Sequence, residues 1–348
     1  MKPEQVARLL EDIEKLLKKK EEHLSDILIK ELLVNVVKLQ SYDLDTLDLK
    51  IMNRALRELR YAFKVFKPYR HIQKVSIFGS ARTPEDHPYY KMAVSFARQL
   101  AEAGFMVITG AADGIMRAGN EGAGAGKSFG VNIHLPSEQG PNEFIVDDPK
   151  LITFKYFFTR KLLFVMESDA IALFPGGFGT HDEGFETLTL IQTGKASPRP
   201  LLLLDLPGEG YWEGWDRFIR EQILARGLIS PEDTSLYSIA YSPEEAVREI
   251  SHFYSTYHST RQVHDKLVVR LERGLSDEGI AELNKEFGDL LVSGRIERTD
   301  PLPDEMNEPE LADLPRLVLA YNHKSMGRLT QLIQRINELG AAAADSTA

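Results

Sequence analysis

The stretch "AIALFPGGFGTHDEGFETLTLIQTGK", residues 170–195, decides the fold of this chain. A short apolar run of strand length enters the glycine-rich segment "PGGFGT", after which a helical pattern begins. Glycines let the backbone turn tightly and approach a ligand, and the N–H groups and dipole of the following helix favour a phosphate. The alternative interpretation is a plain strand-to-helix turn with Thr180 as its N-cap.

The helix after this turn carries Asp182, Glu183 and Glu186, which should repel the anion that the turn favours. Asp182 is explained by the helix dipole, whereas Glu183 and Glu186 share one helix face because they are three residues apart. Their expected counter-charges are Arg160 and Lys161, upstream of the strand. Arg160 follows the apolar run "FKYFF", so we expect it to be partly buried, where an arginine needs an anionic partner. A solvated helix face is the alternative for both cations.

The same alternation of strand and helix recurs along the chain. Expected helices cover residues 88–103, 157–167 and 179–193, and expected strands lie within "KVSIFGS" (74–80), "FMVITGAADG" (105–114), "FGVNIHLP" (129–136) and "PLLLLDL" (200–206). Strands that alternate with helices predict a doubly wound, Rossmann-like α/β fold with a parallel sheet covered on both faces. Ligands bind beyond the carboxyl ends of such strands, and Gly79, Gly110 and Gly176 all lie there.

Further segments flank this central domain, for which we expect residues 71–258. Residues 1–70 are predicted to be a helical extension, since Val6, Leu9, Ile13 and Leu16 recur at helical spacing. Residues 259–340 contain a weak repeat of strand followed by helix, which predicts a small αβ module of the ACT-like kind. Residues 341–348, "AAAADSTA", are expected to be a disordered tail.

Composition excludes several classes of function. The chain has 348 residues and a formal net charge of −10, which argues against nucleic-acid binding because that depends on Lys and Arg. It contains no cysteine, which excludes disulfides and thiolate chemistry and suits a cytoplasmic protein. Its first residues are too charged for a signal peptide, and no apolar run is long enough to span a membrane.

One nucleotide-binding motif fails on topology. The segment "EGAGAGKS", residues 121–128, resembles a P-loop, but Glu121 stands where that motif requires its first glycine. A P-loop also leads from a strand into a helix, whereas this segment ends a helix and leads into a strand. We therefore interpret Gly126 as a helix C-terminal glycine and Lys127 as a surface lysine.

Residues 160–186, "RKLLFVMESDAIALFPGGFGTHDEGFE", resemble the signature of the LOG family, once misnamed lysine decarboxylases. That signature is an Arg-Lys pair before a strand, followed by Pro-Gly-Gly-x-Gly-Thr-x-x-Glu. The segments "FGSAR" (78–82) and "TGAADGIMRAGNEGA" (109–123) are similar to the family's first two turns, and "KSFGVNIHLPSEQGPN" (127–142) to its third strand. The resemblance covers residues 74–256.

This resemblance implies hydrolysis of the N-glycosidic bond of nucleoside 5′-monophosphates, AMP-like or cytokinin riboside monophosphates, to a free base and ribose 5-phosphate. It assigns catalysis to Arg160 and Glu183, with no metal and no cofactor. Positive charge builds on the ribose as the bond breaks, and a nearby carboxylate stabilises it. Expected phosphate-binding residues are Gly176, Gly177, Gly179, Thr180 and Ser80, and other expected pocket residues are Gly79, Gly110, Gly114, Met116, Lys161 and Glu186. His181 and His134 are expected to be exposed and structural, respectively.

The resemblance also implies a homodimer or higher homo-oligomer. One departure is the second turn, "TGAADG", where Ala111 and Ala112 stand in place of glycines found in many relatives, so the base that is accepted stays open. The main alternative function is a binding or carrier protein, since a related group with this fold carries the molybdenum cofactor without hydrolysis. A third is a nucleotide sensor that acts through the flanking segments. The pair Arg160 and Glu183 favours the enzyme.

Overall fold

The computed structural model describes residues 24–135, 140–305 and 307–345. These divide into two compact units, residues 1–60 and 61–348. The described part of the first unit contains α2 (Leu24–Lys38) and most of α3 (Thr46–Phe66), which continues into the second unit. The helix predicted around Val6–Leu16 lies outside the described residues. The predicted domain limits at residues 70 and 258 stay predictions.

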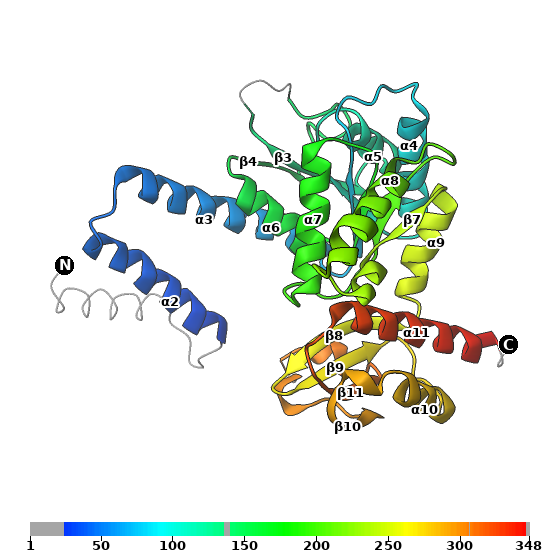
Figure 1. Cartoon of the computed structure of the whole chain (residues 1–348). Helices are drawn as coiled ribbons and strands as arrows, with labels where there is room; N and C mark the ends of the chain where they lie inside the picture. The colour runs from blue at the N-terminus through cyan, green and yellow to red at the C-terminus, as the bar shows by residue number, and fades with distance from the viewer. Residues whose placement is uncertain (1–23, 136–139, 306, 346–348) are drawn as a thin grey trace. The chain divides into compact units, whose positions relative to one another are not determined.

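A parallel sheet of seven strands forms the centre of the second unit (Figure 1), in the order β4-β3-β2-β1-β5-β6-β7. The order reverses between β1 and β5, which makes this the switch point of a doubly wound fold. The predicted Rossmann-like α/β class is therefore confirmed. The strands are β1 (Lys74–Phe78), β2 (Met106–Thr109), β3 (Ser128–Ile133), β4 (Leu151–Phe154), β5 (Ala170–Leu173), β6 (Leu201–Leu204) and β7 (Ser238–Ala240).

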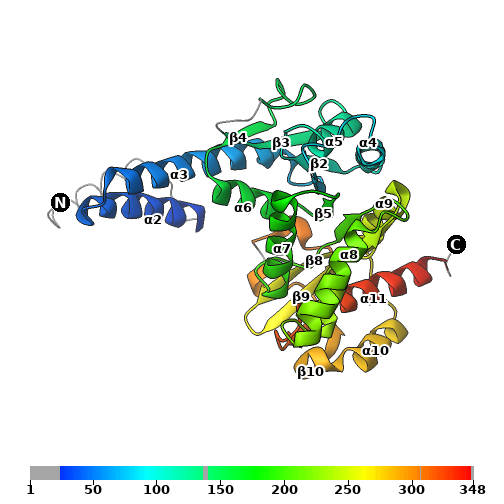
Figure 2. The ribbon, with the colours of Figure 1, turned by 45° about the horizontal axis from the view of Figure 1, so that its top comes forward.

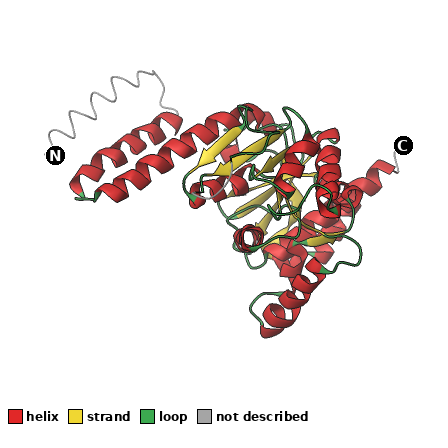
Figure 3. Cartoon of the chain, turned by 90° about the horizontal axis from the view of Figure 1, so that it is seen from above, coloured by secondary structure: helices red, strands yellow, loops and turns green. Residues whose placement is uncertain are grey.

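Helices cover both faces of this sheet (Figure 3). Three of them, α4 (Pro88–Glu102), α5 (Ile115–Ala123) and α9 (Pro243–Phe253), form one apolar core with the strands. The other face holds α6 (Phe157–Glu167), α7 (Phe178–Gln192) and the end of α3. There Phe164 of α6 packs on Phe78 with ring centres 4.6 Å apart, and Phe66 of α3 stacks on Phe129 at 4.3 Å. A short helix, α8 (Tyr211–Phe218), follows β6.

Two strands of the sheet differ from the sequence-based expectation, because β4 and β7 were not predicted. Both are short, and polar residues border them, so neither has a long apolar run. The segment that resembles a P-loop does run from helix to strand, since α5 ends within it at Ala123 and β3 begins at its last residue, Ser128. Its helix cap is Gly124, with φ of 76°, rather than the predicted Gly126, whose φ of 82° belongs to the following turn. Lys127 is exposed, as predicted, and donates to the Ala101 carbonyl at 2.9 Å.

The C-terminal part of the second unit is a four-stranded antiparallel sheet with two helices on one face (Figure 2). In the strand order β10-β11-β9-β8, β9 and β10 are parallel because both are antiparallel to β11, which lies between them. This is the split βαβ arrangement of ferredoxin-like folds. Its elements are β8 (Tyr257–Val263), β9 (Lys266–Leu271), α10 (Asp277–Glu286), β10 (Leu291–Arg298), β11 (Arg316–Tyr321) and α11 (Met326–Asp345).

The two edge strands of this sheet, β8 and β10, were not predicted, because each carries polar residues along most of its length. The helix α11 continues to Asp345, into the segment predicted to be a disordered tail. On the face opposite the helices, the paired residues Arg270 and Arg316 both contact the carboxylate of Glu305, and all three side chains are buried. This ionic cluster ties the connector between β10 and β11 to the sheet.

Candidate active site

The turns after β1, β2 and β5 meet at the switch point of the seven-stranded sheet. The Ser80 N–H donates to the Pro175 carbonyl at 3.2 Å, and the Ile115 N–H donates to the Ser80 carbonyl at 3.1 Å. These bonds join the three turns beyond the ends of the strands, where a doubly wound sheet binds its ligand.

A cavity of about 670 Å³ opens at this junction. Most of the sequence-predicted site residues line it, and their predicted roles stay predictions. Four do not: Gly114 lines a neighbouring cavity, and Gly176, Lys161 and Glu186 lie beside the site. The predicted residues in the lining are Gly79, Ser80, Gly110, Met116, Arg160, Gly177, Gly179, Thr180 and Glu183.

The N-cap and first turn of α7 form part of the cavity wall. The helix begins at Phe178, and its N-cap, Gly177, provides no side-chain acceptor. The first N–H groups of a helix have no intrahelical partner, so an uncapped N-terminus is suited to an anion. Thr180 is therefore the third helical residue rather than the N-cap, and it is 5% exposed. A Cβ on Gly176 would lie 2.1 Å from the Thr180 hydroxyl, so this close approach requires glycine.

A tyrosine from α8, Tyr211, holds the glycine turn by a hydrogen bond. The Tyr211 hydroxyl donates to the Gly176 carbonyl at 2.6 Å, and Nε2 of His181 lies 2.8 Å from the same hydroxyl. Burial lowers the pKa of His181, which is half-buried rather than exposed as predicted. The imidazole and the phenol together hold the peptide that precedes the uncapped end of α7.

Glu183 is a buried carboxyl group in the wall of the cavity, with 7% of its surface exposed. Burial raises its pKa to about 7, although the positive charges of Lys161 and Arg160 act in the opposite direction. Negative charge on Glu186 and Asp182 adds to the increase. Glu183 can therefore exchange a proton near neutral pH, a property of catalytic acids and bases.

Lys161 does not reach the cavity but neutralises the two neighbouring carboxylates. Its Nζ lies 3.0 Å from Asp182 and 2.9 Å from Glu186. Since Lys161 forms these two ion pairs, it leaves Glu183 as the carboxyl of this helix that faces the cavity from a buried position. The sequence motif places Asp182, Glu183 and Glu186 close together. The ion pairs of the other two acids with Lys161 distinguish Glu183.

Arg160 reaches the cavity from α6 with a fixed guanidinium. Its Nε donates to the Val131 carbonyl at 2.9 Å, and the group lies 5.2 Å from the centre of the Phe164 ring. A Cβ on Gly110 would come within 2.6 Å of Nη2 of Arg160 and of the Met116 sulfur, so a side chain there would displace these two groups. Arg160 and Glu183 thus line the same cavity from two helices.

The second turn is held in a strained backbone conformation at Ala111. Its φ of 62° lies in the left-handed region, which costs an L-residue with a Cβ roughly 1–2 kcal/mol. Two hydrogen bonds hold it, one to the Thr109 hydroxyl at 3.0 Å and one from the Asn142 N–H at 2.9 Å. Ala111 is fully buried behind the turn, whereas Ala112 lines the cavity. Of the two alanines that replace glycines of the family pattern, only Ala112 therefore adds its methyl group to the wall of the cavity.

Several polar or aromatic residues of the lining were not singled out from the sequence, among them Arg82, Asn132 and Phe157. Arg82 ends the segment "FGSAR", and Asn132 interrupts an otherwise apolar strand, so each carried a signal that could have been used. Phe157 is the first residue of α6 and is 51% exposed. It had no signal, because an aromatic residue at a helix start is ordinarily assigned to packing.

Neither a membrane span nor a metal cluster is found in the described part of the chain. None of its helices has an apolar stretch sufficient to cross a bilayer. No three His, Asp or Glu side chains among those residues are grouped so that they could hold a metal ion.

Comparisons with known proteins identify relatives of the central domain. The family model described as "Possible lysine decarboxylase" matches residues 108–250. A "Probable cytokinin riboside 5'-monophosphate phosphoribohydrolase LOGL5" of Oryza sativa subsp. japonica is 27% identical over 161 residues, which are 46% of this chain and 63% of that protein. The Arabidopsis thaliana enzyme LOG3, with the same activity in its name, is 26% identical over 211 residues, 59% of this chain and 94% of that protein.

Similar solved structures include two molybdenum cofactor proteins. The carrier protein of Chlamydomonas reinhardtii is 20% identical and covers 52% of this chain and 96% of its own, with a TM-score of 0.37. The binding protein of Rippkaea orientalis is 23% identical and covers 52% of this chain and 94% of its own, with a TM-score of 0.35.

The raised pKa of Glu183 predicts that this residue destabilises the fold. Its pKa in the folded chain is about 7 against an ordinary value of 4.5, so folding takes up protons between these pH values. The wild type therefore loses stability as the pH rises through this range. We expect Glu183→Gln to increase the free energy of unfolding by about 1–3 kcal/mol at pH 8, and the gain to vanish below pH 4.5.

Urea unfolding of both proteins at several pH values measures this difference. Glu186→Gln is the control, because Glu186 is paired with Lys161 and its loss should not stabilise the chain. An equal stability of Glu183→Gln and wild type at pH 8 would contradict the prediction.

Proposed function

We propose that this chain, which belongs to the LOG family through residues 108–250, hydrolyses the N-glycosidic bond of nucleoside 5′-monophosphates. The observation that carries the proposal is the position of Glu183 on the same helix as the uncapped anion-binding end. Glu183 is 183 − 177 = 6 residues beyond the N-cap Gly177. At a rise of 1.5 Å per residue this is about 9 Å along α7.

This spacing suits a ligand with a phosphate at one end and a reacting sugar carbon several bonds away. In the proposed complex the N–H groups of the first turn of α7 and the Thr180 hydroxyl bind the 5′-phosphate. C1′ then lies toward Glu183, beyond the first turn. The anion and the carboxylate thus contact opposite ends of one nucleotide.

The reaction breaks the bond between C1′ and the base nitrogen and forms a bond between C1′ and a water oxygen. The bonding electron pair leaves with the base, which takes up a proton, while the water loses one. Positive charge develops on C1′ and the ring oxygen in between, and ionised Glu183 stabilises this charge and accepts the proton from water. Arg160 lines the same cavity with its Nε bonded to the Val131 carbonyl, and in the proposed complex its guanidinium acts on the phosphate, on Glu183 or on the leaving base.

The same cavity would serve a protein that binds a nucleotide or a phosphate-bearing cofactor without cleaving it. Only the carboxyl chemistry separates these two functions, because the anion-binding turn is common to both. Incubation of the purified chain with a panel of nucleoside 5′-monophosphates, followed by chromatography of the free bases, distinguishes them. Binding without release of base from any nucleotide would favour the carrier function.

We predict that Glu183→Gln lowers the rate of base release at least about 100-fold and leaves nucleotide binding in place. In the wild type, kcat/KM should rise with pH up to about 7 and then level off, because catalysis requires the ionised form of a group whose pKa is about 7 in the free protein. Initial rates from pH 5 to 9 measure the profile.

The matched control is Glu186→Gln, the same change one turn further along the helix and outside the cavity lining. Its rate should stay within a few-fold of wild type. Undiminished hydrolysis by Glu183→Gln would refute the role given to that residue.

Tyr211→Phe tests the support of the glycine turn. Loss of the hydroxyl removes the bond to the Gly176 carbonyl and should raise KM for nucleotides about 3–10-fold with little change in kcat. Tyr241→Phe is the control, because the Tyr241 hydroxyl also donates to a residue of α8, Glu213, but has no bond to the glycine turn. A fall in kcat without a change in KM would indicate that Tyr211 does not position the phosphate turn.

We also propose that the chain forms a homodimer through α6. Phe158, Leu162 and Met166 leave an apolar surface on this helix, with exposures of 56%, 43% and 55%. Apolar patches of this kind are typical of interaction surfaces. Light scattering of the purified protein should give twice the chain mass of 39.3 kDa, and Leu162→Asp should reduce it toward the monomer. A monomeric wild type would exclude the dimer.

A further inference from the structure

A buried network of three polar side chains adjoins the second turn of the candidate active site, residues 110–114. Thr109 ends β2, Asn120 lies on α5 and Asn142 lies in the segment after β3, with exposures of 0%, 1% and 5%. Hydrogen bonds are electrostatically stronger in the interior than in water, so they constrain the backbone groups that they bond. None of the three residues lines the active-site cavity, and the proposed hydrolysis uses none of them.

The bonds of this network meet at the backbone of Ala111 and Ala112. The Asn142 N–H donates to the Ala111 carbonyl at 2.9 Å, and Nδ2 of Asn142 donates to the Ala112 carbonyl at 3.1 Å and to Oδ1 of Asn120 at 3.0 Å. The same Oδ1 accepts from the Thr109 hydroxyl at 2.8 Å. That hydroxyl oxygen accepts from the Ala111 N–H at 3.0 Å. Both polar backbone groups of Ala111 therefore belong to one connected set of bonds.

Ala111 needs such support because its φ of 62° lies in the left-handed region, which a residue with a Cβ avoids. Its two neighbours, Gly110 and Ala112, line the cavity. A Cβ on Gly110 would lie 2.6 Å from Nη2 of Arg160, so there is little free space between the turn and this guanidinium. A change of φ at Ala111 would therefore move the wall of the cavity beside Arg160.

Asn142 is itself fixed independently of the turn. Its Oδ1 accepts a hydrogen bond from the Phe144 N–H at 3.2 Å. The neighbouring Glu143 forms an ion pair with Arg117 of α5, with 2.7 Å between Oε1 and Nη2. The segment that carries Asn142 is thus attached to α5, and its side-chain amide can hold the turn against relaxation.

We propose that Asn142 is a positioning residue: with Asn120 and Thr109 it holds Ala111 in the left-handed conformation and so fixes the cavity wall beside Arg160. Its effect on a nucleotide rests on the proposed function, whereas its effect on the turn does not. When the bonds from the Asn142 side chain are lost, Ala111 relaxes toward negative φ. The form of the site that binds a nucleotide is then populated less often, which lowers the apparent affinity.

Hydrogen–deuterium exchange of the full chain without a nucleotide tests the effect on the turn. In Asn142→Ala we expect the backbone amides of residues 110–114 to exchange at least about tenfold faster than in the wild type, because local opening is then easier. Unchanged exchange in this turn would overturn the proposal. Since no nucleotide is present, the result stands whether or not the chain releases a base.

Isothermal titration calorimetry tests the effect on the site, with whichever of AMP, GMP, CMP and UMP the wild type binds most tightly. We expect Asn142→Ala to weaken this binding about tenfold, a factor that corresponds to the strain at Ala111. Adding Ala111→Gly to this variant should return the affinity to within about threefold of the wild type, because glycine adopts positive φ readily. Unchanged affinity of Asn142→Ala, or no recovery with glycine, would overturn the proposal. If the wild type binds none of the four, the proposed function fails, and the exchange measurement alone decides the role of Asn142.

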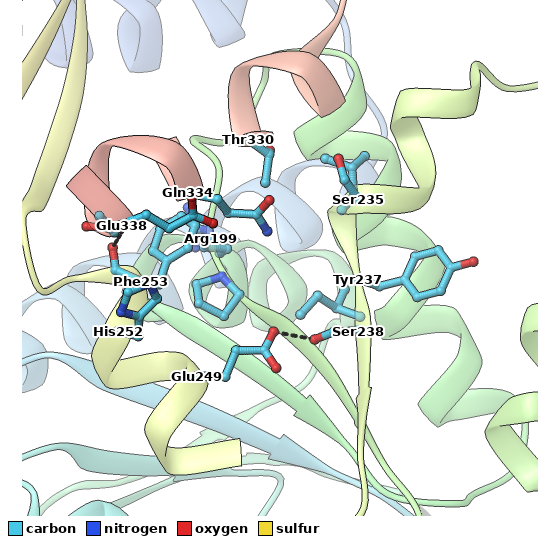
Figure 4. A pocket seen from close by; sticks show the side chains of 14 residues that line it. Arg199, Ser235, Tyr237, Ser238, Glu249, His252, Phe253, Thr330, Gln334 and Glu338 are labelled. Atoms are coloured by element: carbon cyan, nitrogen blue, oxygen red, sulfur yellow. Dashed lines mark hydrogen bonds between the residues drawn. The ribbon is translucent and has the colours of Figure 1, made fainter. Parts of the chain in front are cut away.

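Asn337→Ala is the matched control for a general loss of stability. Asn337 is also a buried asparagine, and it donates to the Phe253 carbonyl at 2.7 Å and accepts from the Thr256 N–H at 3.0 Å. It lines a separate cavity at the start of β6 and β7 (Figure 4). This variant should lose stability but keep the wild-type exchange of residues 110–114 and the wild-type affinity. The same changes as in Asn142→Ala would count against the proposal, because they would not be specific to the turn.

If Asn142→Ala does not fold, Thr109→Val replaces it. Valine keeps the shape of the side chain and removes the hydroxyl that accepts the Ala111 N–H. The turn should again exchange faster and the nucleotide should bind more weakly. Wild-type exchange and affinity in this variant would overturn the proposal in the same way.

Discussion

The candidate site depends on keeping one buried carboxyl group, Glu183, close to the uncapped N-terminus of α7 but outside its first turn. α7 achieves this by placing Glu183 beyond its uncapped first turn, on the same rigid element. Lys161 pairs with the two neighbouring acids, which limits the negative charge around the cavity. Burial keeps the pKa of Glu183 near neutrality, so a single residue can change its protonation state where a sugar cation would form.

The parallel sheet supplies the rigidity that this arrangement needs. The turns after β1 and β5 bond directly to one another, and a side chain at residue 110, after β2, would displace Arg160. Tyr211 of α8 donates to the Gly176 carbonyl of the glycine turn, and His181 of α7 contacts the same hydroxyl. Backbone hydrogen bonds thus join the turns, and side-chain hydrogen bonds hold Gly176 and Arg160, which favours a preorganised site.

The C-terminal sheet and its helices form a second apolar core within the same unit. Their split βαβ core is held on its open face by the buried cluster of Arg270, Arg316 and Glu305. Through α11 they contact the turn that bonds to the far end of α7.

The sequence by itself determined the α/β class, most of the central strands and the turns that meet at the switch point, because these follow from local apolar runs and glycines. It could not show β4, β7, β8 or β10, which are short or polar and are held by neighbouring strands. The family resemblance singled out Glu183, but the sequence could not show its burial, the ion pairs of Asp182 and Glu186 with Lys161, or a role for Tyr211. Only the tertiary structure decided these, because burial, ion pairing and the contacts between distant segments depend on the packed chain.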